Sequence, residues 1–220
     1  MFGIVLVFTD WSTIASFATA LGTLVLAIAT FASIRSANRS ARVAEAAFEA
    51  NLRPVLVTSR LEDPVQKIRW MDNHWALLQG NRGIAEVVDG NIYLAISLRN
   101  AGAGLAVAVG WSVIPEQALS DVPHDEVEHF RRQSRDLYIA PHDIGFWQAA
   151  IREESDRDYA ALRRRIERVE VFTVELLYGD HEGGQRTISR FAMVPFRSDD
   201  AVHWFPSVAL HWNLDRPDPR

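Results

Sequence analysis

The sequence predicts a mainly β protein, a β-sandwich with short helical insertions that follows one transmembrane helix and a helical stalk. Three observations lead to this fold class. The chain opens with a long uncharged segment, its remainder contains several short runs of β-branched and aromatic residues, and Gly, Asn and Asp separate those runs. The long periodic helices of all-helical and doubly wound α/β folds do not occur after residue 53.

The uncharged segment runs from Trp11 to Ile34 and contains no proline, asparagine or glutamine. A helix of this length extends roughly 36 Å, which exceeds the roughly 30 Å of a bilayer core. The flank at residues 1–10 has no basic residue and contains Asp10, unlike the basic start of a cleaved signal peptide. We expect an uncleaved transmembrane helix over residues 11–34, with a signal peptide and a buried helix of a soluble protein as alternatives.

Basic residues flank the span on one side only. Arg35, Arg39 and Arg42 follow it, whereas no Lys or Arg precedes it. Because cytoplasmic flanks of membrane spans are enriched in Lys and Arg, we expect the N-terminus outside and the C-terminal domain in the cytoplasm.

Small residues recur along one side of the span, namely Ala15, Ala18, Gly22, Ala29 and Ala32. Small side chains allow helix backbones to approach closely within lipid. Besides the bilayer itself, the expected partner is therefore a second copy or another protein that contacts this helix. The span is rich in Ala, Thr and Ser throughout, so a chance stripe is the alternative.

The rest of the chain divides into three segments. Residues 35–53 are rich in Ala, Arg and Glu and predict a juxtamembrane helical stalk that ends before Pro54. Residues 54–198 form the predicted sandwich domain. Residues 199–220 are treated as a C-terminal tail, whose aromatic residues either dock on the domain or contact a membrane surface.

Two strand pairs stand out within the domain. Residues 91–98 and 105–114 flank an Asn- and Gly-rich turn and form either a hairpin or a pair that crosses between sheets. Residues 169–178 and 187–194 flank a second turn and predict a hairpin. The residues that we expect to shape these turns are Asn100, Gly102, Gly104, Gly179, Asp180 and Gly183.

Shorter segments complete the prediction. Residues 120–135 and 156–168 are polar and predict short helices, the second with Tyr159, Leu162 and Ile166 on one side. Residues 137–140 and 145–149 predict two strands that flank a turn.

Composition excludes several classes of function. The net charge of −5 argues against nucleic acid as a partner, because phosphate binding needs clustered Lys and Arg. The absence of cysteine excludes thiol catalysis, iron–sulfur clusters and Cys-ligated zinc. Gly102 and Gly104 resemble part of a dinucleotide-binding fingerprint, but β-prone residues follow them instead of a helix. We expect no cofactor, no bound metal and no enzymatic activity.

Histidines provide the main alternative. His124 and His129 lie within a run of carboxylates, and His142 and His181 lie in predicted turns. On a helix, two residues five positions apart differ by about 140°, unlike the spacing of four in zinc-protease helices. Solvated polar surfaces explain these histidines, and a metal-dependent hydrolase that uses them is the alternative function.

Six tryptophans follow the anchor, and core packing is the default explanation for each. An exposed aromatic groove for a peptide or another ligand is the alternative.

Three segments resemble motifs of a widespread type of uncharacterised bacterial single-pass membrane protein. They are Arg53-Pro54-Val55-Leu56, the turn at 98–106 and the hairpin at 178–183. The family combines an N-terminal span, a basic helical stalk and an immunoglobulin-like β-sandwich. Leu105 stands where the family often has proline, and the insertions at 116–136 and 152–168 are unusually long and charged. The family has no established activity, so the resemblance implies architecture and supplies no catalytic residues.

These expectations combine into one hypothesis: a binding or assembly module that is tethered to the bacterial inner membrane. Tethering raises the effective concentration of a partner-binding surface at the membrane.

Overall fold

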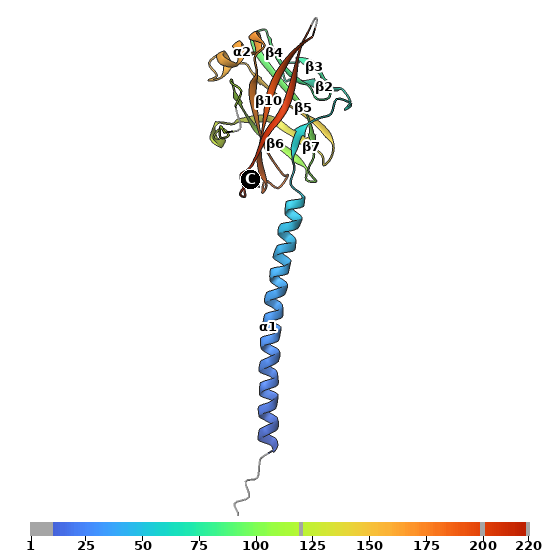
Figure 1. Cartoon of the computed structure of the whole chain (residues 1–220), viewed down its shortest axis with the longest axis vertical. Coiled ribbons are helices and arrows are strands. Elements are labelled where there is room, and N and C mark those ends of the chain that lie inside the picture. Colours follow the sequence, from blue (N-terminus) through green and yellow to red (C-terminus); the bar gives the residue numbers. More distant parts are fainter. Residues whose placement is uncertain (1–10, 119–120, 199–200, 219–220) are drawn as a thin grey trace, which may run out of the picture. The chain divides into compact units, whose positions relative to one another are not determined.

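The structure is a computed structural model of the 220-residue chain and describes residues 11–118, 121–198 and 201–218. The chain divides into two compact units, Met1–Ala50 and Asn51–Arg220 (Figure 1). The predicted N-terminal flank at 1–10 lies outside the described residues.

Helix α1 runs from Trp11 to Asn51 without interruption, and all but its last residue belongs to the first unit. The predicted span and most of the predicted stalk therefore form one helix. The described part of the chain contains one helix that is long and apolar enough to cross a membrane, and no residue of its apolar part is buried. This exposure argues against a core helix of a soluble protein. Hydroxyls inside α1 are satisfied locally, since Thr19 and Thr23 each donate to the carbonyl four residues earlier at 2.8 Å.

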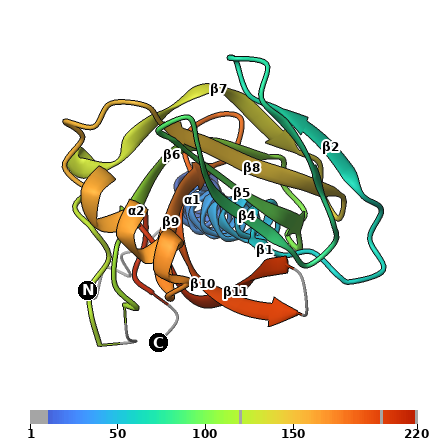
Figure 2. The same ribbon diagram turned by 90° about the horizontal axis from the view of Figure 1, so that it is seen from above.

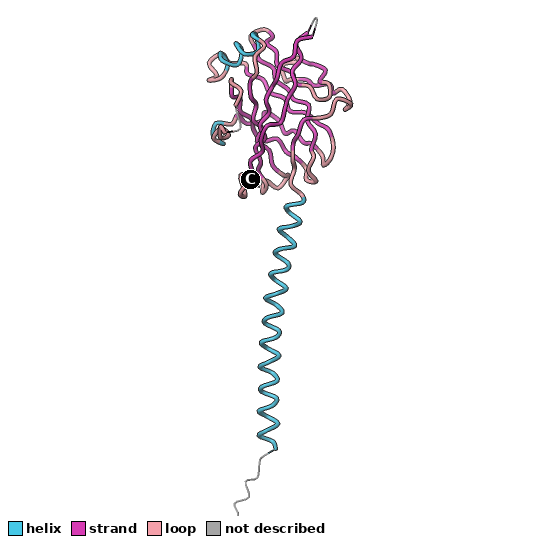
Figure 3. Tube along the Cα trace, viewed as in Figure 1, coloured by secondary structure: helices cyan, strands magenta, loops and turns pink. Residues whose placement is uncertain are grey.

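The second unit is rich in strands (Figure 3). The strands are β1 (Leu56–Thr58), β2 (Gln66–Arg69), β3 (Trp75–Leu78), β4 (Gly83–Val88), β5 (Asn91–Asn100), β6 (Ala106–Ile114), β7 (Arg131–Ile139), β8 (Ile144–Ile151), β9 (Phe172–Gly179), β10 (Arg186–Ser198) and β11 (Ala201–Asn213). A 3-10 turn, η1 (Val127–His129), and helix α2 (Tyr159–Arg168) interrupt them. The mainly β prediction is confirmed.

All strand pairs are antiparallel, and most strands follow one path, β8–β5–β4–β11–β10–β9–β6–β7. β8 occupies one edge of β5 from Ile92 to Arg99, so β1 and β4 share the other edge. The two ends of the path, β7 and β8, contact each other, and Gln133 donates to the Gln148 carbonyl at 3.0 Å. The strands thus curve around a shared core (Figure 2).

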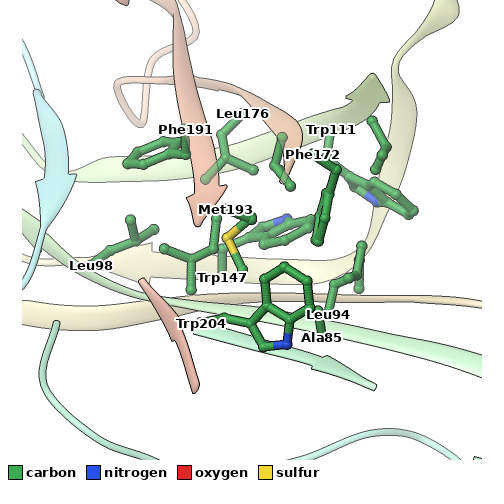
Figure 4. Packing of buried hydrophobic residues seen from close by; sticks show 14 of the residues in the cluster. Ala85, Leu94, Leu98, Trp111, Trp147, Phe172, Leu176, Phe191, Met193 and Trp204 are labelled. Carbon is green, nitrogen blue, oxygen red and sulfur yellow. The ribbon is translucent and has the colours of Figure 1, made fainter. Parts of the chain in front are cut away.

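Alternating residues explain how the strands share this core (Figure 4). β9 contributes Phe172, Val174, Leu176 and Tyr178, and β5 contributes Ile92, Leu94, Ile96 and Leu98. The opposite face of β5 is also covered, because the β2–β3 hairpin packs Ile68, Trp70 and Leu78 against Tyr93 and Ala95. Burial on both faces explains the nearly continuous apolar sequence of β5.

Several predicted elements are confirmed. β9 and β10 form the predicted hairpin. α2 lies within the predicted segment 156–168 and buries Tyr159, Leu162 and Ile166. β5 and β6 do not pair with each other but belong to different parts of the path, so the turn between them makes a crossing connection.

The helix predicted at 120–135 is wrong. Described residues from this segment form η1 and the first part of β7 instead. Tertiary contacts favour the extended form, because β7 pairs with β6 and Arg131 binds Asp156 at 2.5 Å and stacks on Trp111. Residues 201–213, treated above as part of a tail, form β11 and pair with β10.

Candidate functional site

Of the strand pairs described, β4 and β11 have the shortest pairing. They share a single residue pair, Gly83 with Trp204, and diverge beyond it. A cleft of about 420 Å³ opens here, between β4 residues 83–86, β11 residues 202–204 and the end of α2. Its volume falls within the range of small-ligand and peptide sites.

Gly83 permits the close approach at the base of the cleft. A Cβ atom on this residue would lie 2.5 Å from Met193 Cε and 3.2 Å from the Ala95 carbonyl oxygen. Trp204 closes the same region from β11, where it is buried against Phe172 in an edge-to-face contact at 5.2 Å. Met193, Ala95 and Trp204 thus enclose one end of the cleft.

Arg82 brings a positive charge to the cleft. Its Nε and Nη1 atoms are buried and have no hydrogen-bond partner in the part of the chain that the structure describes. The guanidinium carbon lies 3.7 Å from the centre of the Phe205 ring, which holds the group in place by a cation–π contact. Buried guanidinium nitrogens without acceptors are costly, so Arg82 lacks the anionic partner that would offset its burial among the described residues.

The cleft also contains a carboxylate that is already engaged. Glu86 Oε1 lies 2.7 Å from His74 Nε2. His74 in turn stacks on Tyr93, with ring centres 4.1 Å apart. This is the ion pair of Glu86 among the described residues, and none joins Glu86 to Arg82.

A second polar cluster lies on the face of β9 and β10 that points away from the main core. Arg190 donates to Glu175 Oε1 through Nε and Nη2, at 2.8 and 2.6 Å, and both side chains are fully buried. Arg190 also donates to the carbonyls of Val122 and Pro123, at 2.8 and 2.7 Å. The pair therefore fastens the charged insertion after β6 onto the sheet.

Asp125 extends this cluster. Its backbone N–H donates to Glu175 at 2.8 Å, and its carboxylate accepts from Ser112 at 2.6 Å. Burial alone would raise the pKa of Asp125, but hydrogen bonds from Ser112 and His129 and the charge of Arg157 outweigh it and lower the pKa. Asp125 is thus held as a carboxylate that receives hydrogen bonds, which suits a structural role better than a general base.

The four candidate histidines occupy three different loops. His124 and His129 both lie beside Asp125, whereas His142 occupies the β7–β8 turn with φ of 61° and His181 lies in the β9–β10 turn. No group of three or more His, Cys, Asp or Glu that could hold a metal occurs in residues 11–118, 121–198 and 201–218.

Asn100 organises the turn after β5. Its Oδ1 accepts from the N–H groups of Val55 and Gly102 at 3.1 and 3.0 Å. Its Nδ2 donates to the carbonyls of Gly104 and Ile139 at 2.7 and 3.1 Å. The side chain thereby holds its own turn, the start of β1 and the end of β7 together.

Gly102 and Gly104 lie against the chain that enters the domain. A Cβ atom would stand 2.1 Å from the Arg53 carbonyl oxygen at Gly102 and 1.6 Å from that of Leu52 at Gly104. Only glycine permits this approach.

The other predicted turn residues lie between β9 and β10. Gly183 has φ of 76°, which favours glycine, and Asp180 Oδ1 accepts from the Gly184 N–H at 2.9 Å. A Cβ atom on Gly179 would lie 2.7 Å from the Gln185 carbonyl oxygen. These residues shape a tight turn and bring no reactive group to a cavity.

The small residues of the span, Ala15, Ala18, Gly22 and Ala29, are exposed on α1, and nothing lies within 4 Å of a Cβ placed on Gly22. Tryptophans divide by location: the buried ones are Trp70, Trp111, Trp147 and Trp204, whereas Trp75 on β3 is 56% exposed.

Neither the cleft nor the Arg190–Glu175 pair is among the features predicted from the sequence. The pair had a detectable signal, because each residue is a charge with apolar residues around it inside a predicted strand of the same hairpin. The cleft had none, since it depends on how far β4 and β11 diverge. Comparison of the chain with protein-family models, with curated protein sequences and with solved structures found no match.

Proposed function

We propose that this protein is a membrane-anchored binding module that recruits a partner to the inner membrane through the β4–β11 cleft. The observation that carries the proposal is the single-pair junction at Gly83 and Trp204, which leaves a ligand-sized opening in an otherwise continuous sheet. The length and exposure of α1 support anchoring. Arg35, Arg39 and Arg42 support a cytoplasmic domain.

Two further features belong to the proposal. The domain is an immunoglobulin-like sandwich in which β4, β5 and β8 pack over the core against β6, β9 and β10. The anchor contacts a second copy or a partner helix through its small residues at 15, 18, 22 and 29.

Photo-crosslinking in native membranes tests the binding role. A crosslinking amino acid replaces Val202 at the rim of the cleft in the tagged full-length chain, and Val109 on β6 serves as the control site. The two positions are 42% and 45% exposed. We expect a discrete adduct from position 202 that position 109 does not form.

A surface charge at the rim provides a second control. Leu77→Glu should reduce the adduct, whereas Met71→Glu, at an exposed position outside the cleft lining, should not. Equal adducts from positions 202 and 109, or an adduct insensitive to Leu77→Glu, would contradict the proposal.

A further inference from the structure

The outer edge of β4 is open along the cleft. The Ser97 N–H donates to the Arg82 carbonyl at 3.0 Å, and the ladder continues with Ile84 opposite Ala95. Hydrogen-bonding directions alternate along an antiparallel strand, so the N–H and C=O groups of Gly83, Ala85 and Val87 point away from β5. Of these residues only Gly83 is paired with β11 among the described residues. Beyond that pair, no described strand occupies this edge of β4, although α2 packs against the strand.

A free edge binds an extended segment by main-chain hydrogen bonds, and the neighbouring side-chain pockets then select its sequence. Here the neighbouring surface is mixed. Ile166 on α2, Val169 after it and Val202 on β11 are apolar, whereas Arg82 is cationic. The cleft thus suits a short segment that combines apolar side chains with one anionic group.

Arg82 specifies the anionic group. In the described residues it forms no ion pair, and the carboxylate in the cleft, Glu86, is held by His74. A guanidinium whose Nε and Nη1 atoms lack acceptors favours an anionic partner, and a carboxylate supplies both the opposite charge and an acceptor oxygen. The chain has a net charge of −5 and therefore attracts polyanions only weakly over long distances. A cationic site at Arg82 thus selects an anionic group at short range and does not select polyanions in general.

Building on the function proposed above, we infer that the cleft binds an extended segment of a partner protein that pairs with the free edge of β4 and places an acidic side chain against Arg82. The backbone of Ala85 supplies main-chain contacts within the cleft. Phe205 keeps the guanidinium oriented before the ligand arrives.

Fluorescence anisotropy with the full-length chain in detergent micelles tests this inference. The probe is a labelled peptide that alternates Val with Thr around one central Asp, and matched peptides carry Asn at the centre or N-methyl groups along the backbone. We expect the Asn and the N-methylated peptides to bind at least about tenfold more weakly than the Asp peptide.

Variants identify the residue responsible. Arg82→Gln should abolish the preference for Asp over Asn, whereas Arg69→Gln, at an exposed arginine of β2 outside the cleft lining, should retain it. Thermal unfolding followed by tryptophan fluorescence establishes that each variant is folded. If Arg82→Gln does not fold, Arg82→Lys keeps the charge and should still prefer Asp.

The outcomes separate the two proposals. Equal binding of the Asp and Asn peptides overturns the inference that the cleft binds an extended acidic segment. A preference for Asp that survives Arg82→Gln or disappears in Arg82→Lys overturns it as well. Binding that is insensitive to N-methylation overturns the strand pairing. Failure of every peptide to bind also overturns it. If crosslinking at position 202 still succeeds, the binding role of the cleft stands and the ligand belongs to another class.

Discussion

Arg190 and Glu175 lie directly opposite each other on β10 and β9, and neither side chain has any exposed surface. The guanidinium binds one carboxylate oxygen twice and uses its remaining donors for backbone carbonyls of the insertion. Trp212 covers the group from β11, with its ring centre 4.7 Å away. Because removal of one member leaves the other charge buried without its partner, this contact governs the stability of the β10 face.

Glu175→Gln should destabilise the domain strongly. Breaking a buried ion pair typically costs about 3–5 kcal/mol, because the remaining charge stays desolvated. Urea unfolding of the full-length chain in detergent, followed by tryptophan fluorescence, measures the change.

Glu167→Gln is the matched control for this change. It removes a carboxylate from an exposed i, i+4 pair with Arg163 on α2 and should alter stability little. Similar unfolding midpoints for the two variants would show that the buried pair contributes no special stability.

Gly104→Ala should destabilise the junction between the turn after β5 and the chain that enters the domain. The new Cβ atom would lie 1.6 Å from the Leu52 carbonyl oxygen, so residues 52–54 must move. Gly184→Ala is the control, because its Cβ atom would meet only Asp180 Oδ2 at 3.8 Å. The melting temperature should fall by several degrees in Gly104→Ala and stay nearly constant in Gly184→Ala. Equal melting temperatures would contradict the need for glycine at position 104.

The features that could be predicted from the sequence are those marked by a pattern within one continuous segment. Trp11–Ile34 is marked by the absence of charge that a membrane span requires, and β9–β10 is marked by two apolar runs around a Gly- and Asp-rich turn. Each signal lies within a few residues, so a sequence pattern can reveal it. The glycines at 102 and 104 also follow from turn chemistry, although their contact with residues 52–53 does not.

Tertiary contacts explain the failures. Residues 131–135 are polar and helix-compatible, but Arg131 and Arg132 pair with β6, and the segment begins strand β7. β11 contains Pro206 and a mixed polar pattern, and its long pairing with β10 overrides both. The cleft, and the absence of an ion-pair partner for Arg82 among the described residues, depend on how β4 and β11 separate. The sequence of either strand alone does not determine that separation.

The domain should lose stability at low pH through Asp215. Burial alone would raise the pKa of this carboxyl, but its ion pair with Arg53 outweighs burial and lowers the pKa below the ordinary 3.8. A carboxyl with a depressed folded-state pKa stabilises the native state above its unfolded pKa, and this contribution disappears as the pH falls through the folded value. The unfolding free energy should therefore decline as the pH is lowered from about 5 to 3.

Asp215→Asn identifies the contribution of this residue. The variant should be less stable than the native chain at pH 7, and the difference should shrink toward pH 3. Glu62→Gln, at an exposed carboxylate without an ion pair in the described residues, should leave the pH profile unchanged. A constant difference between Asp215→Asn and the native chain across this range would contradict the linkage.

Gly22→Leu should weaken self-association if copies of the anchor pack through their small residues. The larger side chain separates the helix backbones and removes close contacts in lipid. Leu24→Ile, at another exposed position of α1, conserves side-chain volume and should have little effect. Förster transfer between labelled full-length chains in vesicles measures association. Equal transfer in Gly22→Leu and the native chain would exclude this helix face as the contact.

The orientation of the anchor should depend on Arg35, Arg39 and Arg42. These residues supply the positive charge next to the span, whereas residues 1–10 contain none. A fluorescent reporter that matures only in the cytosol, fused after Arg220, should therefore fluoresce in the native chain. Replacing the three arginines with serine while adding lysines to the N-terminal flank should invert the helix and abolish fluorescence at equal expression. A dark fusion of the native chain at full length would place the domain, and with it the partner of the cleft, on the opposite side of the membrane.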